Sequence, residues 1–297
     1  MDGVNNRSSD ERFMRRALAL ARKGEGTVSP NPLVGAVIVR NGKIIGEGFH
    51  RCCGENHAEI NALRNATEDV AGATFYITLE PCSHHGRTPP CVNALISCRP
   101  GRVVIGAVDP NPLVSGKGIA ALMQNGIPTE VGVLDAACRE INRFFFKFIR
   151  TGLPYVTLKF AQTLDGRIAT VTGDARWVSS PPSRRFAHRL RATHDAILVG
   201  AGTIRTDDPE LTCRLVRGRD PLRIVLDSRL RLPPDAKVFT DGKPTLVVST
   251  GRATADRRRP LEEKGIEVLE IAEGMEGRID LGQLLIALGK RNITSLL

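Results

Sequence analysis

Three side chains that commonly bind transition metals accompany one acidic residue in the first part of the chain. The histidine of His57-Ala58-Glu59 is followed at a distance by Pro81-Cys82 and then by Cys91. One imidazole and two thiolates suit Zn²⁺ and leave its fourth position open to water. Glu59, two residues from His57, can carry a proton from that water to a leaving amine. The pattern predicts a zinc hydrolase that removes an amino group from a heterocycle.

A closed, structural zinc site is the alternative for the same residue types. Such a site takes four protein ligands, whereas three good ones are evident here. His84 and His85 lie between the two cysteines, where we expect solvated side chains outside the metal shell, and the pair Cys52-Cys53 could compete for the metal. The position of Glu59 favours the catalytic reading.

Length and composition predict two ordinary globular domains. The chain has 297 residues, 41% of them hydrophobic and 25% charged, which is enough for about two domains with their own cores. No apolar segment approaches the roughly 20 residues that span a bilayer, and the N-terminus is polar. Seven cysteines in such a chain argue against a disulfide framework. We therefore expect a cytoplasmic enzyme, which can be a homo-oligomer.

The net charge of +10 favours anionic partners, either nucleic acid or a phosphorylated metabolite and a nucleotide cofactor. A nucleic-acid-editing deaminase would carry cysteines two residues apart and aromatic side chains for base stacking. Here residues 83–90 separate the cysteines, and aromatic residues make up 4% of the chain. A small phosphorylated substrate is the preferred partner, and neither nucleic acid nor membrane is expected.

Hydrophobic periodicity and turn residues predict an α/β sandwich in the first half. Ser9 or Asp10 can cap a helix with an apolar face of Phe13, Ala17, Leu20 and Ala21, and Asn41-Gly42 predicts a hairpin turn. Further strands are expected over 33–39, 44–49, 74–79, 102–108 and 129–133, and helices over 57–66, 92–97 and 119–124. Two helix N-termini would then lie near the metal, where they help to keep a thiolate ionised.

A second α/β series follows Thr151-Gly152-Leu153-Pro154, so we predict domains over 1–150 and 151–297. Its strands are expected over 156–161, 196–199, 223–226, 245–248 and 266–269, with a helix over 281–290. The chain then ends in an apolar segment, 293–297, that resembles the start of another strand. On this basis we expect the second domain to be incomplete at its C-terminus.

Longer motifs resemble a known family, the bifunctional deaminase-reductases of riboflavin biosynthesis. They are the run from Pro81 to Cys91 together with His57-Ala58-Glu59, the turn Asp109-Pro110-Asn111-Pro112, and Pro30-Asn31-Pro32-Leu33-Val34-Gly35. The likeness extends from about Phe13 to Leu297. It implies a cytidine-deaminase-like α/β/α sandwich followed by a dihydrofolate-reductase-like α/β domain.

The resemblance also implies the first reaction and its residues. The substrate would be a diaminopyrimidinone with a ribosylamino 5′-phosphate, which loses its 2-amino group while Glu59 protonates the departing ammonia. His57, Cys82 and Cys91 match the metal ligands. The positions that match contacts to the pyrimidine, ribose or phosphate are Asn31, His50, Arg87, Asp109 and Asn111. Two of these, Asn31 and Asn111, also lie between prolines, where a turn alone explains them.

For the second domain the resemblance implies NADPH-dependent reduction of the ribosyl group to ribityl. The motifs are Val199-Gly200-Ala201-Gly202-Thr203, whose glycines let backbone N–H groups approach a phosphate, and the segment 206–214. The positions that match cofactor contacts are Ala161, Trp177, Thr203, Asp207 and Ser228. Those that match substrate contacts are Lys159, Arg191, Leu211 and Arg214. Trp177 could instead anchor a core.

One departure from the family affects the second activity. The chain stops before the glutamate-glycine-glycine loop that the family places after its last strand. That loop supports the cofactor pyrophosphate, and hydride transfer needs a well-positioned nicotinamide. We therefore expect intact deamination and impaired reduction. A second domain that serves as a non-catalytic scaffold is the alternative.

Overall fold

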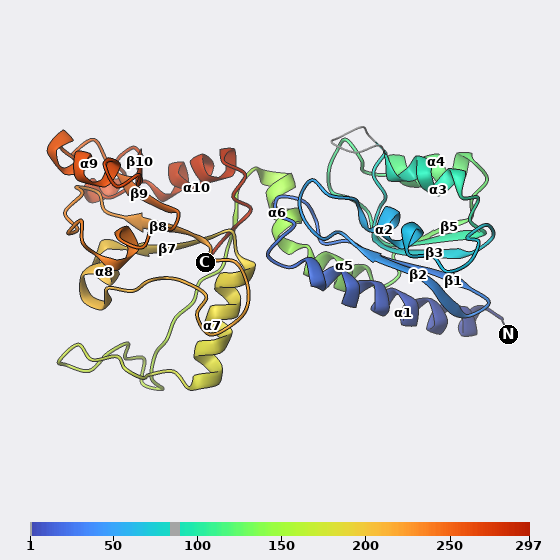
Figure 1. Cartoon of the computed structure of the whole chain (residues 1–297), viewed down its shortest axis with the longest axis horizontal. Coiled ribbons are helices and arrows are strands. Elements are labelled where there is room, and N and C mark those ends of the chain that lie inside the picture. The colour runs from blue at the N-terminus through green and yellow to red at the C-terminus, as the bar shows by residue number, and fades with distance from the viewer. Residues whose placement is uncertain (1, 84–89) are drawn as a thin grey trace. The chain divides into compact units, whose positions relative to one another are not determined.

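A computed structural model describes residues 2–83 and 90–297, which form two compact units, Met1–Thr151 and Gly152–Leu297. Each unit contains one β-sheet with helices packed on it (Figure 1). The chain is therefore of the α/β class, as expected from the sequence. Among the described residues, no helix is both long and apolar enough to cross a membrane.

The sheet of the first unit has the strand order β2-β1-β3-β4-β5. The strands are β1 (Gly35–Arg40), β2 (Lys43–Phe49), β3 (Thr74–Leu79), β4 (Arg102–Ala107) and β5 (Thr129–Val131). Asn41 and Gly42 both have positive φ, which confirms the predicted hairpin turn between β1 and β2. Because β3, β4 and β5 are parallel, their carboxyl ends lie along one edge.

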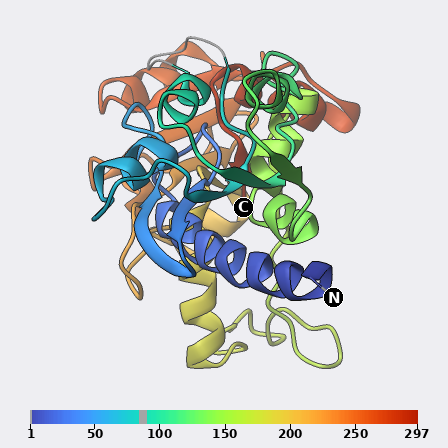
Figure 2. The ribbon, with the colours of Figure 1, turned by 90° about the vertical axis from the view of Figure 1, so that its right-hand side faces the viewer.

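Helices cover both faces of this sheet. They are α1 (Asp2–Ala21), α2 (Ala58–Arg64), α3 (Cys91–Ser97), α4 (Lys117–Gln124), α5 (Asp135–Ile141) and α6 (Arg143–Thr151), with a 3₁₀ turn at Arg22–Gly24. Alternate residues of β1 point to opposite sides: Val37 packs in one core with Phe13 of α1, and Ile38 in the other with Ala62 of α2. Figures 1 and 2 show α1 along one face of the sheet.

The start of α1 differs from the prediction of a cap at Ser9 or Asp10. The helix begins at Asp2, and Asp10 lies within it, 1% exposed. Its carboxylate accepts hydrogen bonds from the Tyr76 hydroxyl (2.7 Å) and from Arg102 (2.8 and 3.0 Å). The capping prediction was wrong because this carboxylate is bonded to distant side chains rather than to the N–H groups of its own helix.

The second unit is built on a parallel sheet with the order β10-β9-β8-β7-β11-β6. The strands are β6 (Tyr155–Val156), β7 (Ala196–Gly200), β8 (Leu222–Leu226), β9 (Thr245–Ser249), β10 (Glu267–Glu270) and β11 (Ser295–Leu296). The helices are α7 (Pro181–Thr193), α8 (Ala201–Asp207), α9 (Ala255–Glu262) and α10 (Leu281–Lys290), with 3₁₀ turns at Lys237–Phe239 and Met275–Gly277. One apolar core includes Ile204 of α8, and the other includes Leu284 of α10.

The strand predicted over 156–161 is not formed beyond Val156. The Thr157 N–H still donates to the Leu296 carbonyl oxygen (2.8 Å), and after it the chain leaves the sheet and loops away in a series of turns up to residue 180 (Figure 1). Leu158 and Phe160 are each 75% exposed. Their alternation with polar residues indicated a half-buried strand, but a strand also needs a partner for its hydrogen bonds. In the described residues the pairing with β11 ends at Val156, and the last hydrogen bond to that strand is the one from Thr157.

A close approach of α2 to β2 gives the first testable prediction. A methyl group on Gly48 would lie 2.3 Å from the carbonyl oxygen of Ala58 and 2.3 Å from the nitrogen of Ala62. Gly48→Ala should therefore lower the free energy of unfolding by about 1–3 kcal/mol, because the backbone of α2 must move. Urea denaturation of the full chain measures this change.

Gly202→Ala is the matched control, because its added methyl group would meet nothing within 4 Å. We expect it to change the free energy of unfolding by less than about 1 kcal/mol. Equal destabilisation by the two substitutions would contradict the argument from close packing.

Candidate functional site

The structure brings His57, Cys82 and Cys91 together in the first unit. Their possible ligand atoms all lie within 4.8 Å of one another. His57 Nδ1 is 3.1 Å from the Cys91 sulfur and 3.6 Å from the Cys82 sulfur. One nitrogen and two sulfur donors in this spacing fit Zn²⁺ with room for a further, non-protein ligand. Among the described residues, these three form the one cluster of this kind.

Local structure explains why the three side chains meet. His57 is the N-cap residue of α2, Cys91 is the first residue of α3, and Cys82 follows the carboxyl end of β3. The Cys91 backbone N–H donates to the Cys82 sulfur (3.3 Å). Two helix N-termini therefore face the sulfur atoms, and their partial positive charge favours a thiolate.

The protonation of the two cysteines agrees with a metal-binding role. Contact with the Cys91 thiol, and then with His57, lowers the pKa of Cys82. The same contact raises the pKa of Cys91, because one proton is shared between two neighbouring sulfur atoms. Hydrogen bonding to Cys82 raises the pKa of His57. The cluster thus already favours one thiolate, and a cation would favour the second.

Glu59 lies beside this cluster in the first turn of α2. Its side chain is 3% exposed, and its Oε2 has no hydrogen-bond partner among the described residues. Burial raises the pKa of Glu59 to about 7, opposed by the positive charge of His57. A carboxyl group with a pKa near neutrality both accepts and donates protons readily. A buried carboxylate oxygen that no described residue bonds, next to a cluster able to hold a metal, suits a proton carrier.

Asn31 and His50, two predicted substrate contacts, are paired next to the cluster. The His50 ring is 5.3 Å from the His57 ring. His50 Nδ1 lies 3.1 Å from the Asn56 carbonyl oxygen, which can only accept, so Nδ1 carries the proton and Nε2 accepts from the Asn31 amide (3.1 Å). Burial lowers the pKa of His50 and keeps the ring neutral.

Asp109 and Asn111 follow β4, at the same sheet edge as Cys82. Asp109 is 7% exposed and accepts from the Asn111 N–H (2.8 Å). Burial, together with the negative charges of Glu80 and Cys82, raises the pKa of Asp109 to about 6. The backbone N–H of Asp109 donates to the carboxylate of Glu80 (3.2 Å), two residues before Cys82. Arg87, the remaining predicted contact in this unit, lies outside the described residues.

In the second unit, strand order collects some of the predicted residues at one edge. Thr203 and Asp207 lie on α8, directly after β7, and Ser228 follows β8. Gly200 pairs with Leu226 in the parallel sheet, so both strands end at the same level. Thr203 and Asp207 are exposed, and Ser228 is half-buried. The carboxyl edge of a parallel sheet is where α/β proteins commonly bind ligands.

Two predicted substrate contacts, Arg191 and Arg214, converge on the segment after α8. Arg191 Nη1 donates to the Thr212 carbonyl oxygen (2.9 Å), and Arg214 Nη1 donates to the Thr212 hydroxyl (3.1 Å). Burial, and then the positive charge of Arg214, lowers the pKa of Arg191. Two close guanidinium groups favour an anionic ligand. Leu211, in contrast, is 4% exposed and packs in the core.

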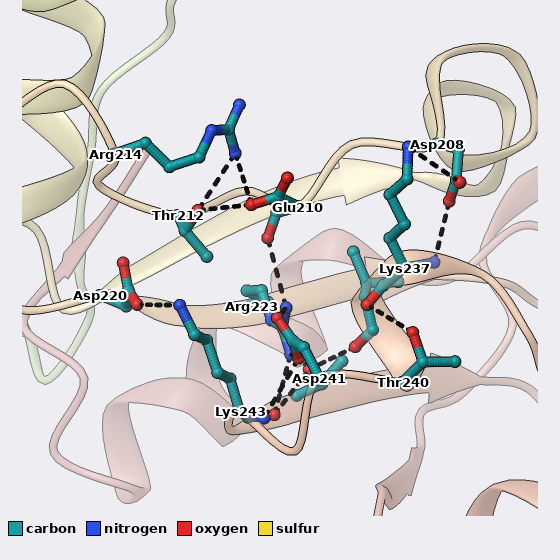
Figure 3. Close-up of polar contacts among 12 residues, drawn as sticks. Asp208, Glu210, Thr212, Arg214, Asp220, Arg223, Lys237, Thr240, Asp241 and Lys243 are labelled. Carbon is teal, nitrogen blue, oxygen red and sulfur yellow. Dashed lines mark hydrogen bonds and ion pairs between the residues drawn. The ribbon is translucent and has the colours of Figure 1, made fainter.

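A buried arginine that the sequence analysis missed supports this segment (Figure 3). Arg223 is 1% exposed, and each of its five N–H donors has an acceptor. The acceptors are both carboxylate oxygens of Asp241, the Thr245 hydroxyl and the carbonyl oxygens of Lys243 and Glu210. The Glu210 side chain in turn accepts from Arg214 (3.0 Å). Arg223 thus ties the segment 208–214 to β8 and β9.

The other predicted residues of the second unit, Lys159, Ala161 and Trp177, lie on the looping segment 157–180. Trp177 is 69% exposed and stacks under the Arg184 guanidinium at 3.9 Å. The alternative that Trp177 anchors a core is therefore wrong. The strand predicted over 156–161 would have held Lys159 and Ala161 in the sheet.

Asn142 is a further residue that the sequence analysis did not single out. Its side-chain oxygen accepts from the Leu33 N–H (2.7 Å), and its amide donates to the Leu33 carbonyl oxygen (2.9 Å). It thereby holds the Pro-Asn-Pro segment that carries Asn31. A lone asparagine in a helical sequence carries no signal of a contact with a residue so distant in sequence.

Cys82→Ser gives a direct test of the metal site. Replacing the thiolate with a hydroxyl removes a soft ligand, and we expect zinc content after dialysis to fall well below that of the parent protein. Elemental analysis by mass spectrometry measures it. Cys52→Ser is the control, because Cys52 is exposed and outside the cluster. Full zinc occupancy in the Cys82 variant would remove Cys82 from the ligand set.

Two protein-family models match the chain. The cytidine and deoxycytidylate deaminase zinc-binding region matches residues 7–107, and the RibD C-terminal domain matches residues 154–297. The riboflavin biosynthesis protein RibD of Aquifex aeolicus is 45% identical over 98% of this chain and 84% of that protein. Its Escherichia coli counterpart is 43% identical over 97% of this chain and 80% of that protein.

Solved structures give the same result. RibD of Acinetobacter baumannii has a TM-score of 0.87 at 39% identity, covering 98% of this chain and 80% of that one. The deaminase/5-amino-6-(5-phosphoribosylamino)uracil reductase of Thermotoga maritima also scores 0.87, at 40% identity, covering 98% and 81%. With most of each relative covered, the comparisons do not bear out the expected truncation of the second domain. The chain belongs to the RibD family of riboflavin biosynthesis proteins.

Proposed function

We propose that this chain carries out two successive reactions of riboflavin biosynthesis. The first is hydrolytic deamination of 2,5-diamino-6-ribosylamino-4(3H)-pyrimidinone 5′-phosphate, in which the carbon–nitrogen bond of the 2-amino group breaks and ammonia leaves. The second is reduction of the ribosyl side chain to ribityl by NADPH. The observation that carries the proposal is the cluster of His57, Cys82 and Cys91 beside the buried carboxyl of Glu59.

In the first reaction, His57, Cys82 and Cys91 would hold zinc. When bound, zinc acts as a Lewis acid that makes water a better nucleophile at neutral pH. Glu59 would accept the proton of the attacking water and deliver it to the leaving amine. Its raised pKa, about 7, supports both transfers.

Four described residues would orient the pyrimidine and its ribose phosphate: Asn31, His50, Asp109 and Asn111. Amide and carboxyl groups read the donors and acceptors of a ring edge. Their positions support this role, since Asn31 and His50 are paired next to His57, and the Asp109 N–H is bonded to Glu80, two residues before Cys82. Arg87 would clamp the phosphate through two parallel hydrogen bonds.

In the second reaction, hydride passes from NADPH to the ribosyl carbon and a proton completes the product. Thr203, Asp207 and Ser228 would contact the cofactor at the carboxyl edge of the sheet, and Arg191 and Arg214 would bind the anionic substrate. We assign Ala161 and Trp177 to the cofactor, and Lys159 and Leu211 to the substrate, on family resemblance. We further propose that residues 1–150 deaminate and residues 151–297 reduce. A cytoplasmic location and a homo-oligomer stay predictions.

One turnover experiment tests both activities. The purified, zinc-loaded chain is incubated with the diaminopyrimidinone ribosyl phosphate, with and without NADPH, and products are identified by mass. Without NADPH, we expect a product in which oxygen replaces the 2-amino group of the substrate. With NADPH, we expect this product to gain a hydride and a proton as well. Deamination without reduction would favour a scaffold role for the second unit. An unchanged substrate under both conditions would overturn the proposal.

Glu59→Gln tests the proton carrier. The amide has nearly the same shape but cannot accept and release a proton, so kcat for deamination should fall by about 10²–10⁴-fold with zinc content unchanged. Glu55→Gln, on the exposed loop before His57, is the matched control and should keep full activity. Retained turnover in the Glu59 variant would rule out the assigned role.

A further inference from the structure

Glu80 is a buried carboxylate between the metal ligands and the predicted substrate residues. It follows β3 directly, stands two residues before Cys82, and is 3% exposed. Its Oε2 accepts from the backbone N–H groups of Asp109 (3.2 Å) and Gly116 (3.0 Å). Its Oε1 accepts from those of Gly118 (3.0 Å) and Ile119 (3.3 Å). All four donors belong to the segment 109–119, which follows β4.

These bonds join the ends of two parallel strands. Leu79 and Ala107 are paired at the last position of β3 and β4, and the Glu80 N–H donates to the Ala107 carbonyl oxygen (2.9 Å). The start of α4 also packs against the neighbouring residue, since a methyl group on Gly118 would lie 2.2 Å from the Pro81 carbonyl oxygen. The segment 109–119 therefore rests directly on Glu80-Pro81.

The segment held in this way carries Asp109 and Asn111. Its shape is further defined by Asn111, whose carbonyl oxygen accepts from Val114 and Ser115 (2.8 Å each) and whose side chain accepts from Leu113 (3.0 Å). The turn is thus also held by hydrogen bonds of its own. Its bonds to Glu80 connect the turn to the end of β3, which leads to Cys82.

We propose that Glu80 is a positioning residue for deamination, which sets the place of Asp109 and Asn111 relative to the metal ligand Cys82. The inference rests on the proposed function, because it takes the segment 109–111 as the side that binds the pyrimidine. A misplacement of about 1 Å between a substrate-binding group and the reacting centre can cost about 10²-fold in rate. Glu80 joins the segment 109–111 to the strand end that leads to Cys82, so it controls the distance between the substrate-binding residues and the metal ligand.

A carboxylate is required because each of its oxygens faces two N–H donors. In glutamine one oxygen is replaced by an NH₂ group, which cannot accept and would oppose two backbone N–H groups. Two backbone donors would lose their acceptor, and losing the acceptor of a donor costs stability where that donor is shielded from water. The shape of the side chain would otherwise be preserved.

The test is Glu80→Gln, compared with Glu130→Gln in the full, zinc-loaded chain. Glu130 lies on β5 of the same unit, where it is paired with Arg102 and partly exposed. For Glu80→Gln we expect kcat/KM for deamination to fall about 10–100-fold, largely through a higher KM, with zinc content equal to that of the parent protein. Glu130→Gln should change kcat/KM less than about 2-fold.

Amide hydrogen exchange provides a readout that is independent of turnover. In Glu80→Gln, residues 109–119 should exchange faster than in the parent protein, whereas Glu130→Gln should leave them unchanged. Unchanged exchange together with an unchanged KM would overturn the inference. Loss of zinc would also overturn it, because the substitution would then act through the metal ligand Cys82 and not through the segment 109–119. If the parent protein does not deaminate the pyrimidinone, the proposed function fails, and exchange still decides whether Glu80 holds the segment.

Gly118→Ala is the second variant, for the case in which Glu80→Gln does not fold. It keeps the carboxylate but pushes α4 away from Pro81. We expect a raised KM, faster exchange over 109–119 and normal zinc content. Parent-like values for both KM and exchange in this variant would overturn the inference.

Discussion

The first unit depends on bringing one nitrogen and two sulfur atoms from three separate segments to within 4.8 Å of one another. Helix N-termini and a strand end meet this requirement, because His57 precedes α2, Cys91 begins α3 and Cys82 follows β3. The central strands and two apolar cores hold these ends in place. Close contacts at glycine, such as that between Gly48 and α2, leave little freedom for the helix that carries His57 and Glu59.

Burial then determines the chemistry of the acidic groups near the cluster. Glu59 and Glu80 are equally buried, at 3% exposure, but their hydrogen bonding differs. Within the described part of the chain, one oxygen of Glu59 has no hydrogen-bond partner, and burial raises the pKa of this residue to about 7, whereas both oxygens of Glu80 accept backbone N–H groups. An unsatisfied carboxyl is suited to exchanging protons, and a satisfied one is suited to holding structure. The same residue type is therefore suited to two different purposes within this unit.

In the second unit a parallel sheet brings some of the predicted site residues together. Parallel strands place the residues that follow β7 and β8 at one edge, so that α8 and Ser228 become neighbours in the fold. The segment after α8 has positive φ at Asp208 and Leu211, a conformation that non-glycine residues adopt at a cost. The fully bonded guanidinium of Arg223 and the contact from Arg191 hold this segment.

Residue type and spacing alone singled out the three residues that meet in the cluster, Glu59 beside it, the α/β class and most strands, since these follow from local chemistry and periodicity. Tertiary structure decided what depends on distant partners. Asp10 bonds Tyr76 and Arg102 instead of capping a helix, and the strand predicted over 156–161 ends where its pairing with β11 ends. Glu80 could be recognised only from the N–H donors around it, and Arg223 only from the acceptors around it. The sequence shows that a charged residue is present, but not which groups surround it once it is buried.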